Sequence, residues 1–251
     1  MDLSPFSLAD KKVLITGGGR GIGRACAEAM AQAGADLTIT SRTQEQLDQT
    51  AAAITSRGGR VSVCRCDITD AEASAKLSEE IGQLDVLVNN AGISPVYQRA
   101  EQMNNEAWEK ILDLNLNSVF RLTRSIGSQM MQNGGGAIIN MTSIGASLAL
   151  PKLSAYSASK AALTSLTQVL AVEWAAHGIR VNAVAPGYVE TSMTEGLHQS
   201  EHLSRQIEER TPLGRFGRPD EVAWAVVFLA SEAASYITGT TLHIDGGWTA
   251  V

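Results

Sequence analysis

Short apolar runs alternate with longer stretches of helical periodicity along almost the whole chain. Seven runs have the length and composition of buried β-strands, at residues 13–16, 36–40, 60–64, 86–89, 137–141, 180–184 and 240–244. Helical spacing or strong helix formers occupy residues 24–33, 44–57, 108–131, 155–177 and 219–230. This alternation predicts a doubly wound α/β fold of the Rossmann type, a seven-stranded parallel sheet with helices on both faces. A ligand is expected at the carboxyl ends of the strands.

The composition agrees with one soluble domain. The chain has 251 residues, of which 44% are hydrophobic, which is enough for a single sizeable core over residues 1–251. The net charge of −6 argues against nonspecific binding to nucleic acid or to an anionic membrane, because both need basic surfaces. No apolar run approaches the roughly 20 residues that span a bilayer, and the N-terminus lacks a secretory signal pattern. We expect a soluble, cytoplasmic protein.

The three cysteines are Cys26, Cys64 and Cys66. An odd and sparse set is typical of a reducing compartment. Cys64 and Cys66 lie two positions apart on a predicted strand, roughly 6.7 Å along it, which does not suit a disulfide. The histidines show no zinc-ligand spacing with them. We interpret the thiols as buried structural groups and expect no metal site.

A glycine-rich turn separates the first predicted strand from the first predicted helix. It reads Gly17-Gly18-Gly19-Arg20-Gly21-Ile22-Gly23. Glycines let the backbone approach a pyrophosphate, which then rests on the helix N-terminus, where amide donors and the helix dipole favour an anion. Alone, such a turn is as easily a tight connection between a strand and a helix. The order strand, turn and helix favours a dinucleotide site.

Tyr156 and Lys160 lie four positions apart in a predicted helix, and Ser143 follows a predicted strand. The spacing places a phenol beside an ammonium. A free phenol has a pKa of about 10, and a nearby cation lowers that pKa because it favours the phenolate. A pKa of roughly 7 requires about 4 kcal/mol of differential stabilisation. We expect Lys160 to supply part of it and the positive ring of an oxidised nicotinamide to supply the rest.

Together these motifs resemble those of the short-chain dehydrogenase/reductase family in its single-domain form, over nearly the whole chain. The glycine turn after Thr16 is one signature, and Asn89-Asn90-Ala91-Gly92 after an apolar run is the second. The resemblance implies a catalytic set of Asn115, Ser143, Tyr156 and Lys160. It also implies that Asn115 kinks its helix and holds a water that links Lys160 to solvent. The residues expected at the cofactor are Gly17, Gly19, Arg20, Gly21, Ile22, Ser41, Arg42, Asp67, Ile68, Asn89, Ala91, Gly92, Tyr156, Lys160, Pro186, Gly187, Val189, Thr191 and Met193.

Two members of this set also have structural interpretations. Ser143 could only begin a turn, and Asn115 is unusual inside a helix because its amide competes for backbone hydrogen bonds. Four matching positions together with a cofactor turn favour the catalytic interpretation. By resemblance Asp67 contacts the adenine amino group, but it could equally cap a helix, and both roles can hold together.

The residues after the second predicted strand indicate the cofactor. NAD-specific folds usually carry an acidic residue there, which holds the ribose hydroxyls. This chain instead reads Ser41-Arg42-Thr43. The guanidinium of Arg42 can hold a 2′-phosphate, and Arg20 can approach the same group, so we predict NADP(H). The alternative is that Arg42 is a solvated residue at the start of a helix.

The resemblance implies reversible reduction of a ketone or keto ester to a secondary alcohol. Ser143 would donate a hydrogen bond to the carbonyl oxygen, and Tyr156 would supply the proton. The polar segment 192–209 is expected to form a mobile lid over the substrate. The candidate walls of the substrate pocket are Ser94, Pro95, Tyr97, Gly145, Ala146, Leu153, Tyr188, Met193 and Leu197.

Other functions remain open. The C-terminal run at residues 239–247 resembles the tetrameric oxoacyl-carrier-protein reductase branch of the family. No Lys or Arg stands in the turn 130–134 or at His177, where an acidic carrier protein needs a basic rim, so carrier-bound substrates rank second. A polyol or sugar dehydrogenase is a further alternative. A sensor that binds NADP without chemistry ranks last, because it would not need the four catalytic residues.

The helices at 108–131 and 155–177 carry apolar or small residues on more than one face. One face covers the sheet, so the other faces predict a partner. The resemblance adds a second contact through the helix at 219–230 and the C-terminal strand. Two self-complementary patches predict a homotetramer, unless both patches are ordinary core.

Overall fold

The computed structural model describes residues 4–94 and 96–251. Its seven strands form one parallel sheet in the order β3-β2-β1-β4-β5-β6-β7. The strands are β1 (Lys12–Thr16), β2 (Asp36–Ser41), β3 (Arg60–Arg65), β4 (Val86–Asn89), β5 (Gly136–Met141), β6 (Ile179–Pro186) and β7 (Thr241–Ile244). Each predicted strand begins and ends within two residues of the observed strand. The predicted Rossmann-type fold is confirmed, and the strand order reverses between β1 and β4.

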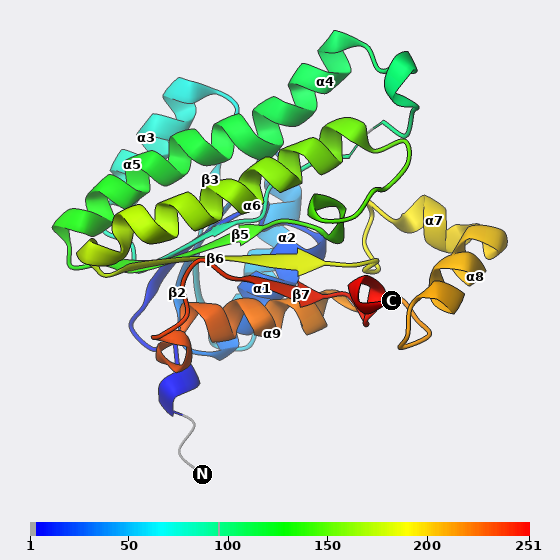
Figure 1. The fold of residues 1–251 in the computed structure, drawn as a ribbon. Helices are drawn as coiled ribbons and strands as arrows, with labels where there is room; N and C mark the ends of the chain where they lie inside the picture. The colour runs from blue at the N-terminus through cyan, green and yellow to red at the C-terminus, as the bar shows by residue number, and fades with distance from the viewer. Residues whose placement is uncertain (1–3, 95) are drawn as a thin grey trace.

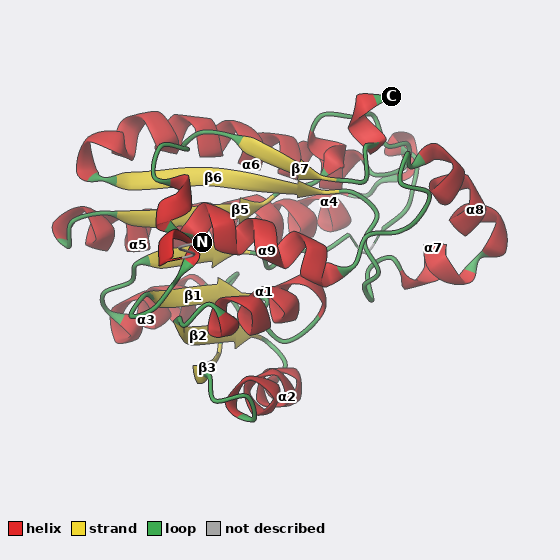
Figure 2. Ribbon diagram, turned by 90° about the horizontal axis from the view of Figure 1, so that it is seen from below, coloured by secondary structure: helices red, strands yellow, loops and turns green. Residues whose placement is uncertain are grey.

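Helices cover both faces of the sheet (Figures 1 and 2). One face carries α3 (Ala71–Ile81), α4 (Asn105–Leu112), α5 (Ser118–Gln132) and α6 (Ser154–Trp174). The other face carries α1 (Gly21–Gln32), α2 (Gln44–Thr55) and α9 (Pro219–Ala230). Two short helices, α7 (Glu195–Gln199) and α8 (Glu201–Arg210), lie beyond the carboxyl ends of the strands. Short 3₁₀ turns lie at Ser4–Phe6, Ala100–Gln102, Ile144–Ala146, Ala175–His177, Glu232–Ala234 and Trp248–Ala250.

The alternation of side chains along the strands builds two cores. Val13 and Ile15 of β1 pack into the apolar cluster beneath α1 and α9. Leu14, between them, packs into the cluster beneath α3, α5 and α6. Successive strand residues point to opposite faces, so a strand buried on both sides must be apolar throughout. Within the described residues no helix has the length and apolar content of a membrane span.

The helix α3 was not predicted. It begins after Asp70, whose carboxylate accepts hydrogen bonds from the amides of Glu72 and Ala73, both at 3.0 Å. The cap of this helix is therefore Asp70, and the alternative that gave the role to Asp67 is wrong. Asp67 instead accepts hydrogen bonds from the amide and hydroxyl of Thr69, at 3.0 and 2.8 Å.

The helix predicted at residues 108–131 belongs to a longer helical run with an irregular middle. A π-helical segment, Asp113–Asn117, joins α4 to α5 and contains Asn115. Such a segment widens one turn, which changes the direction of the side chains that follow. The thiols of Cys26, Cys64 and Cys66 are free, and Cys64 is only partly buried.

Candidate active site

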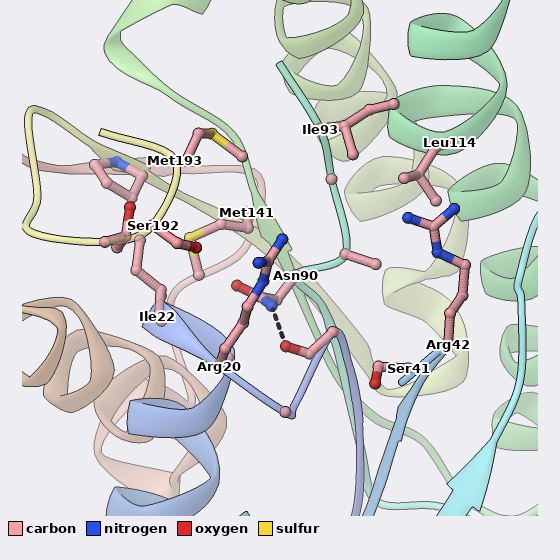
Figure 3. A pocket seen from close by; sticks show the side chains of 18 of the residues that line it. Arg20, Ile22, Ser41, Arg42, Asn90, Ile93, Leu114, Met141, Ser192 and Met193 are labelled. Carbon is pink, nitrogen blue, oxygen red and sulfur yellow. Dashed lines mark hydrogen bonds between the residues drawn. The ribbon is translucent and has the colours of Figure 1, made fainter. Parts of the chain in front are cut away.

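A cleft of about 330 Å³ opens at the carboxyl ends of the strands, where the sheet order reverses (Figure 3). The predicted site residues that line it are Gly17, Gly19, Arg20, Gly21, Ile22, Ser41, Arg42, Asp67, Ile68, Ala91, Gly92, Ser143, Tyr156, Lys160, Pro186, Gly187, Val189, Thr191 and Met193. Asn89 and Asn115 are not among the lining residues. The lining residues that prediction from sequence missed are Gly23, Thr40, Thr43, Gln46, Cys66, Asn90, Ile93, Leu114, Met141, Thr142, Ser192 and Thr194.

The glycine turn is fastened to the loop after β4. Gly17 has a φ of 68°, and a Cβ there would lie 2.8 Å from Nδ2 of Asn90. That Nδ2 donates hydrogen bonds to the carbonyl oxygens of Thr16 and Gly17, at 3.0 and 3.2 Å. The hydroxyl of Thr16 accepts from the amides of Asn90 and Ala91. Only a residue without a side chain fits between these two loops.

The N-terminus of α1 faces the cleft through Gly21, Ile22 and Gly23. Its first turn contains no acidic residue, and the side chain of Arg20 does not cap it. The amide donors and the positive end of the helix dipole are therefore left to an anion in the cleft. This donor set, beside a turn too narrow for a Cβ, fits a dinucleotide pyrophosphate.

Two arginines flank the part of the cleft at the end of β2 (Figure 3). The side chain of Arg42 is 60% exposed, and its guanidinium lies 3.9 Å from the carboxylate of Asp67. Helix α2 begins at Gln44, after an N-cap at Thr43, so Arg42 precedes the helix and lines the cleft. Arg20 lines the cleft from the glycine turn.

Helix α6 presents Tyr156 and Lys160 to the cleft one turn apart. Lys160 is only 4% exposed, and its Nζ donates a 2.7 Å hydrogen bond to the carbonyl oxygen of Met141. The same nitrogen lies 5.8 Å from the centroid of the Tyr156 ring. Burial lowers the pKa of Lys160 to about 8, because a low-dielectric environment disfavours the ammonium.

Burial raises the pKa of Tyr156 above its ordinary value, although a hydrogen bond with the side chain of Ser143 lowers it in part. This direction is opposite to the lowering predicted from Lys160, because burial disfavours the phenolate as well as the ammonium. Ser143 also accepts a 3.1 Å hydrogen bond from the amide of Gly145. Its hydroxyl therefore both begins a turn and contacts the phenol.

Asn115 is fully buried and pairs with the backbone of Ile93. Its Oδ1 accepts from the Ile93 amide at 2.8 Å, and its Nδ2 donates to the Ile93 carbonyl at 2.9 Å. Nδ2 also donates to the hydroxyl of Ser159 at 3.2 Å. A Cβ on Gly92 would lie 3.3 Å from Oδ1 of Asn115 and 3.4 Å from Nζ of Lys160. Asn115 thus holds the loop after β4 close to the lysine.

Asn89, predicted at the cofactor, lies in the core instead. Its Nδ2 donates to the hydroxyl of Thr123 and to Oδ1 of Asn140, both at 2.8 Å. Nδ2 of Asn140 donates to the hydroxyl of Thr167 on α6, at 2.9 Å. The side chain of Asn89 therefore supports the sheet and its helices. The neighbouring Asn90 is the residue of this signature whose side chain reaches the glycine turn.

Of the predicted substrate walls within the described residues, only Met193 lines the cleft; Ser94, Gly145, Ala146 and Leu153 do not. Tyr188 and Leu197 pack against an apolar cluster that contains Ile144, Ile207, Phe216 and Trp248. Tyr97 is 62% exposed, and Pro95 lies outside the described residues. The segment predicted as a lid forms α7 and α8.

Comparison with known proteins places the chain among enzymes of related architecture. The profile of the family described as "Enoyl-(Acyl carrier protein) reductase" matches residues 17–249. The 2-dehydro-3-deoxy-D-gluconate 5-dehydrogenase of Bacillus subtilis is 42% identical over 246 residues, which cover 97% of this chain and 96% of that protein. The galactitol 2-dehydrogenase of Rhizobium johnstonii is 41% identical over 251 residues, which cover 97% of each chain.

Among solved structures, a gluconate 5-dehydrogenase from Burkholderia cenocepacia in complex with NADP and tartrate superposes with a TM-score of 0.95. It is 35% identical, and the alignment covers 99% of both chains. The chain belongs to the short-chain dehydrogenase/reductase family of oxidoreductases.

Proposed function

We propose that the protein is an NADP(H)-dependent dehydrogenase that interconverts a secondary alcohol and a ketone on a polyol or a sugar acid. One observation carries the proposal: Ser143, Tyr156 and Lys160 line the same cleft as the N-terminus of α1. The activities named for the related proteins support the sugar and polyol alternative over a simple ketone or keto ester. The NADP in the related structure and the two arginines of the cleft support the choice of cofactor.

The proposed roles follow from the geometry. When bound, NADP(H) supplies or accepts the hydride. The hydroxyl of Ser143 orients the substrate oxygen, and Oη of Tyr156 exchanges a proton with that oxygen. A neutral phenol is the form that donates a proton to a ketone, and burial favours it. Oxidation of an alcohol needs the phenolate, which the Lys160 ammonium favours when it is charged.

Asn115 is assigned a positioning role. Its two hydrogen bonds to Ile93 fix the loop that carries Gly92, and that glycine lies against Lys160. The water relay implied by the family resemblance remains a prediction. The π-helical segment Asp113–Asn117 supports the other part of that prediction, a helix interrupted at Asn115.

The proposal is tested with purified protein and a panel of substrates. NADP⁺ and NAD⁺ are offered with polyols and sugar acids, and NADPH and NADH with ketones, keto esters and acetoacetyl thioesters. We expect turnover with NADP(H) and a polyhydroxylated substrate. Turnover of the thioester alone would favour a carrier-bound substrate. Tight NADPH binding without turnover of any compound would favour the sensor.

A further inference from the structure

Arg210, the last residue of α8, differs from the other arginines in this part of the chain. Arg205, Arg215 and Arg218 each form an ion pair with a carboxylate, at 3.3, 2.7 and 3.1 Å. Within residues 4–94 and 96–251, Arg210 has no acidic partner. Its guanidinium carbon instead lies 4.6 Å from the ring centroid of Trp248. A cation over an indole keeps its full charge and its hydrogen-bond donors.

Trp248 contributes a second donor without a partner. The residue is 4% exposed and lies in the C-terminal 3₁₀ turn. Its indole Nε1 is buried and has no hydrogen-bond acceptor among the described residues. A buried N–H without an acceptor is unfavourable by about 1–3 kcal/mol, so this donor would gain from an added acceptor.

Neither Arg210 nor Trp248 lines the cleft, but Trp248 packs beside residues that adjoin its lining. The ring of Tyr188 stands 4.8 Å from that of Trp248, and its chain neighbours Gly187 and Val189 both line the cleft. Ile144, which follows Ser143, belongs to the same apolar cluster as Trp248. In Figure 1 the C-terminal turn lies beyond the carboxyl ends of the strands, on the side of α8.

The surroundings leave the charge of Arg210 available. Glu190, the acidic residue that follows Val189, lies 3.7 Å from the imidazole of His198. Arg210 also acts on Tyr188, where its charge opposes the rise in pKa that burial causes. In a chain of net charge −6, an unpaired guanidinium at this place provides a local positive site for an anion.

We propose that Arg210 and the indole N–H of Trp248 form a carboxylate subsite, so that the preferred substrate is a hydroxy acid rather than a neutral polyol. This inference rests on the proposed function and narrows its substrate class. A carboxylate accepts charge-assisted hydrogen bonds from a guanidinium, whereas a hydroxymethyl group at the same place gains only neutral ones. The related proteins named above include enzymes for both kinds of substrate, so their names do not decide the question.

The test compares two ligands that differ at one carbon. D-Gluconate carries a carboxylate where D-glucitol carries a hydroxymethyl group. Calorimetry measures the affinity of each for the protein saturated with NADPH, with which neither alcohol can be oxidised. We expect the wild type to bind the acid at least 10-fold more tightly. Arg210→Gln should lower the affinity for the acid by about 10- to 100-fold and leave the affinity for D-glucitol unchanged.

Three further variants separate charge, packing and surface effects. Arg205→Gln removes a guanidinium from the same helix and should change neither affinity. Arg210→Lys keeps the charge and should retain part of the preference for the acid. Trp248→Phe keeps a ring beneath the guanidinium but removes the N–H, and should weaken binding of the acid by about 3- to 10-fold.

Equal affinities of the wild type for both ligands, no measurable binding of the acid, or equal losses for both ligands in Arg210→Gln would overturn the subsite. Turnover separates this failure from that of the proposed function. If D-glucitol is oxidised as efficiently as D-gluconate, the dehydrogenase stands and the subsite does not. If the acid binds through Arg210 but no polyol or sugar acid is oxidised, the subsite stands and the dehydrogenase does not.

Discussion

The ammonium of Lys160 is bonded to the carbonyl oxygen of Met141, the last residue of β5, at 2.7 Å. This contact joins α6, the helix of the proposed catalytic residues, to the end of a central strand. It gives the buried nitrogen one neutral acceptor, which replaces only part of the hydration that the charge loses on folding. The lysine therefore keeps donors for the cleft, but its charge destabilises the folded state.

The first prediction follows from that charge. The pKa of Lys160 is lowered from 10.5 to about 8 in the folded protein, so the unfolded chain binds more protons between these values. Stability should therefore rise with pH across this window, by on the order of 3 kcal/mol from this one group. Urea denaturation of the wild type and of Lys160→Met from pH 7 to 10.5 measures this rise in unfolding free energy. A constant difference in unfolding free energy between the two proteins would contradict the prediction.

The second prediction concerns the proton donor. Tyr156→Phe should lower kcat by about 10² to 10⁴, the usual contribution of general acid catalysis. Affinity for NADPH and the circular dichroism spectrum should stay close to those of the wild type. Tyr236→Phe is the matched control, because Tyr236 is fully exposed and should behave as wild type. Normal turnover by Tyr156→Phe would exclude the assignment.

The third prediction concerns cofactor preference. Arg42→Ala should weaken NADPH binding by about 10- to 100-fold and NADH binding by less than about 3-fold, because only NADPH has a phosphate to lose a charge-assisted contact. Nucleotide fluorescence titration measures both affinities without turnover. Arg57→Ala is the control, since Arg57 pairs with Glu28 and does not line the cleft. Equal losses of affinity for both nucleotides would show that Arg42 does not bind the 2′-phosphate.

The fourth prediction concerns acid stability at the start of α9. Glu221 accepts hydrogen bonds from Arg215 and from the amide of Arg218, and these contacts lower its pKa to about 2. The carboxylate should therefore stabilise the fold above pH 4.5, and this contribution should disappear as the pH falls toward 2. At pH 7, Glu221→Gln should lower the free energy of unfolding by about 1 kcal/mol. Denaturation of the wild type and Glu221→Gln from pH 7 to 3 should show the difference between their unfolding free energies decreasing.

The fifth prediction concerns assembly. Val169 and Val172 of α6 are 48% and 80% exposed, and they lie on one face of the helix with a three-residue spacing. Phe120 of α5 is 40% exposed. We expect α5 and α6 to pair with a second copy, and Trp224 of α9 to lie in a second contact, giving a homotetramer.

Light scattering tests this assembly. The wild type should have about four times the 26.6 kDa mass of one chain, and Val172→Glu should reduce it to a dimer. The mass of a single chain for the wild type would refute the tetramer. A stable wild-type dimer would show that only one patch is an interface.

Much of the fold could be predicted because the central strands are apolar runs, whereas β2, β3 and β7 alternate apolar and polar residues. Helix α3 escaped prediction because its apolar residues are few, although Asp70 and Glu72 mark its start. The close approach of α5 to α6 has no local signal. A Cβ on Gly127 would lie 2.5 Å from the ring of Trp174, and nothing near either residue in the sequence indicates that contact.

The candidate site shows the same limit. Motif spacing brought together Ser143, Tyr156 and Lys160, which the structure places at one cleft. It could not distinguish Asn89 from Asn90, because the direction of each side chain depends on where β4 ends and the loop begins. Nor could it give the direction of the Tyr156 pKa, since burial is a property of the packed structure.

The hydrogen bonds from Asn89 through Asn140 to Thr167 have a consequence for how such an enzyme can change. They tie α6 to the middle of the sheet, so a rotation of the catalytic helix would leave several buried amides and hydroxyls without partners. Helices α7 and α8 lie outside this line, beyond the ends of the strands. In the proposed enzyme, we expect substitutions in these two helices to change the substrate without moving Tyr156 or Lys160. The fold thus keeps the residues proposed for proton transfer apart from the segments whose sequence can vary.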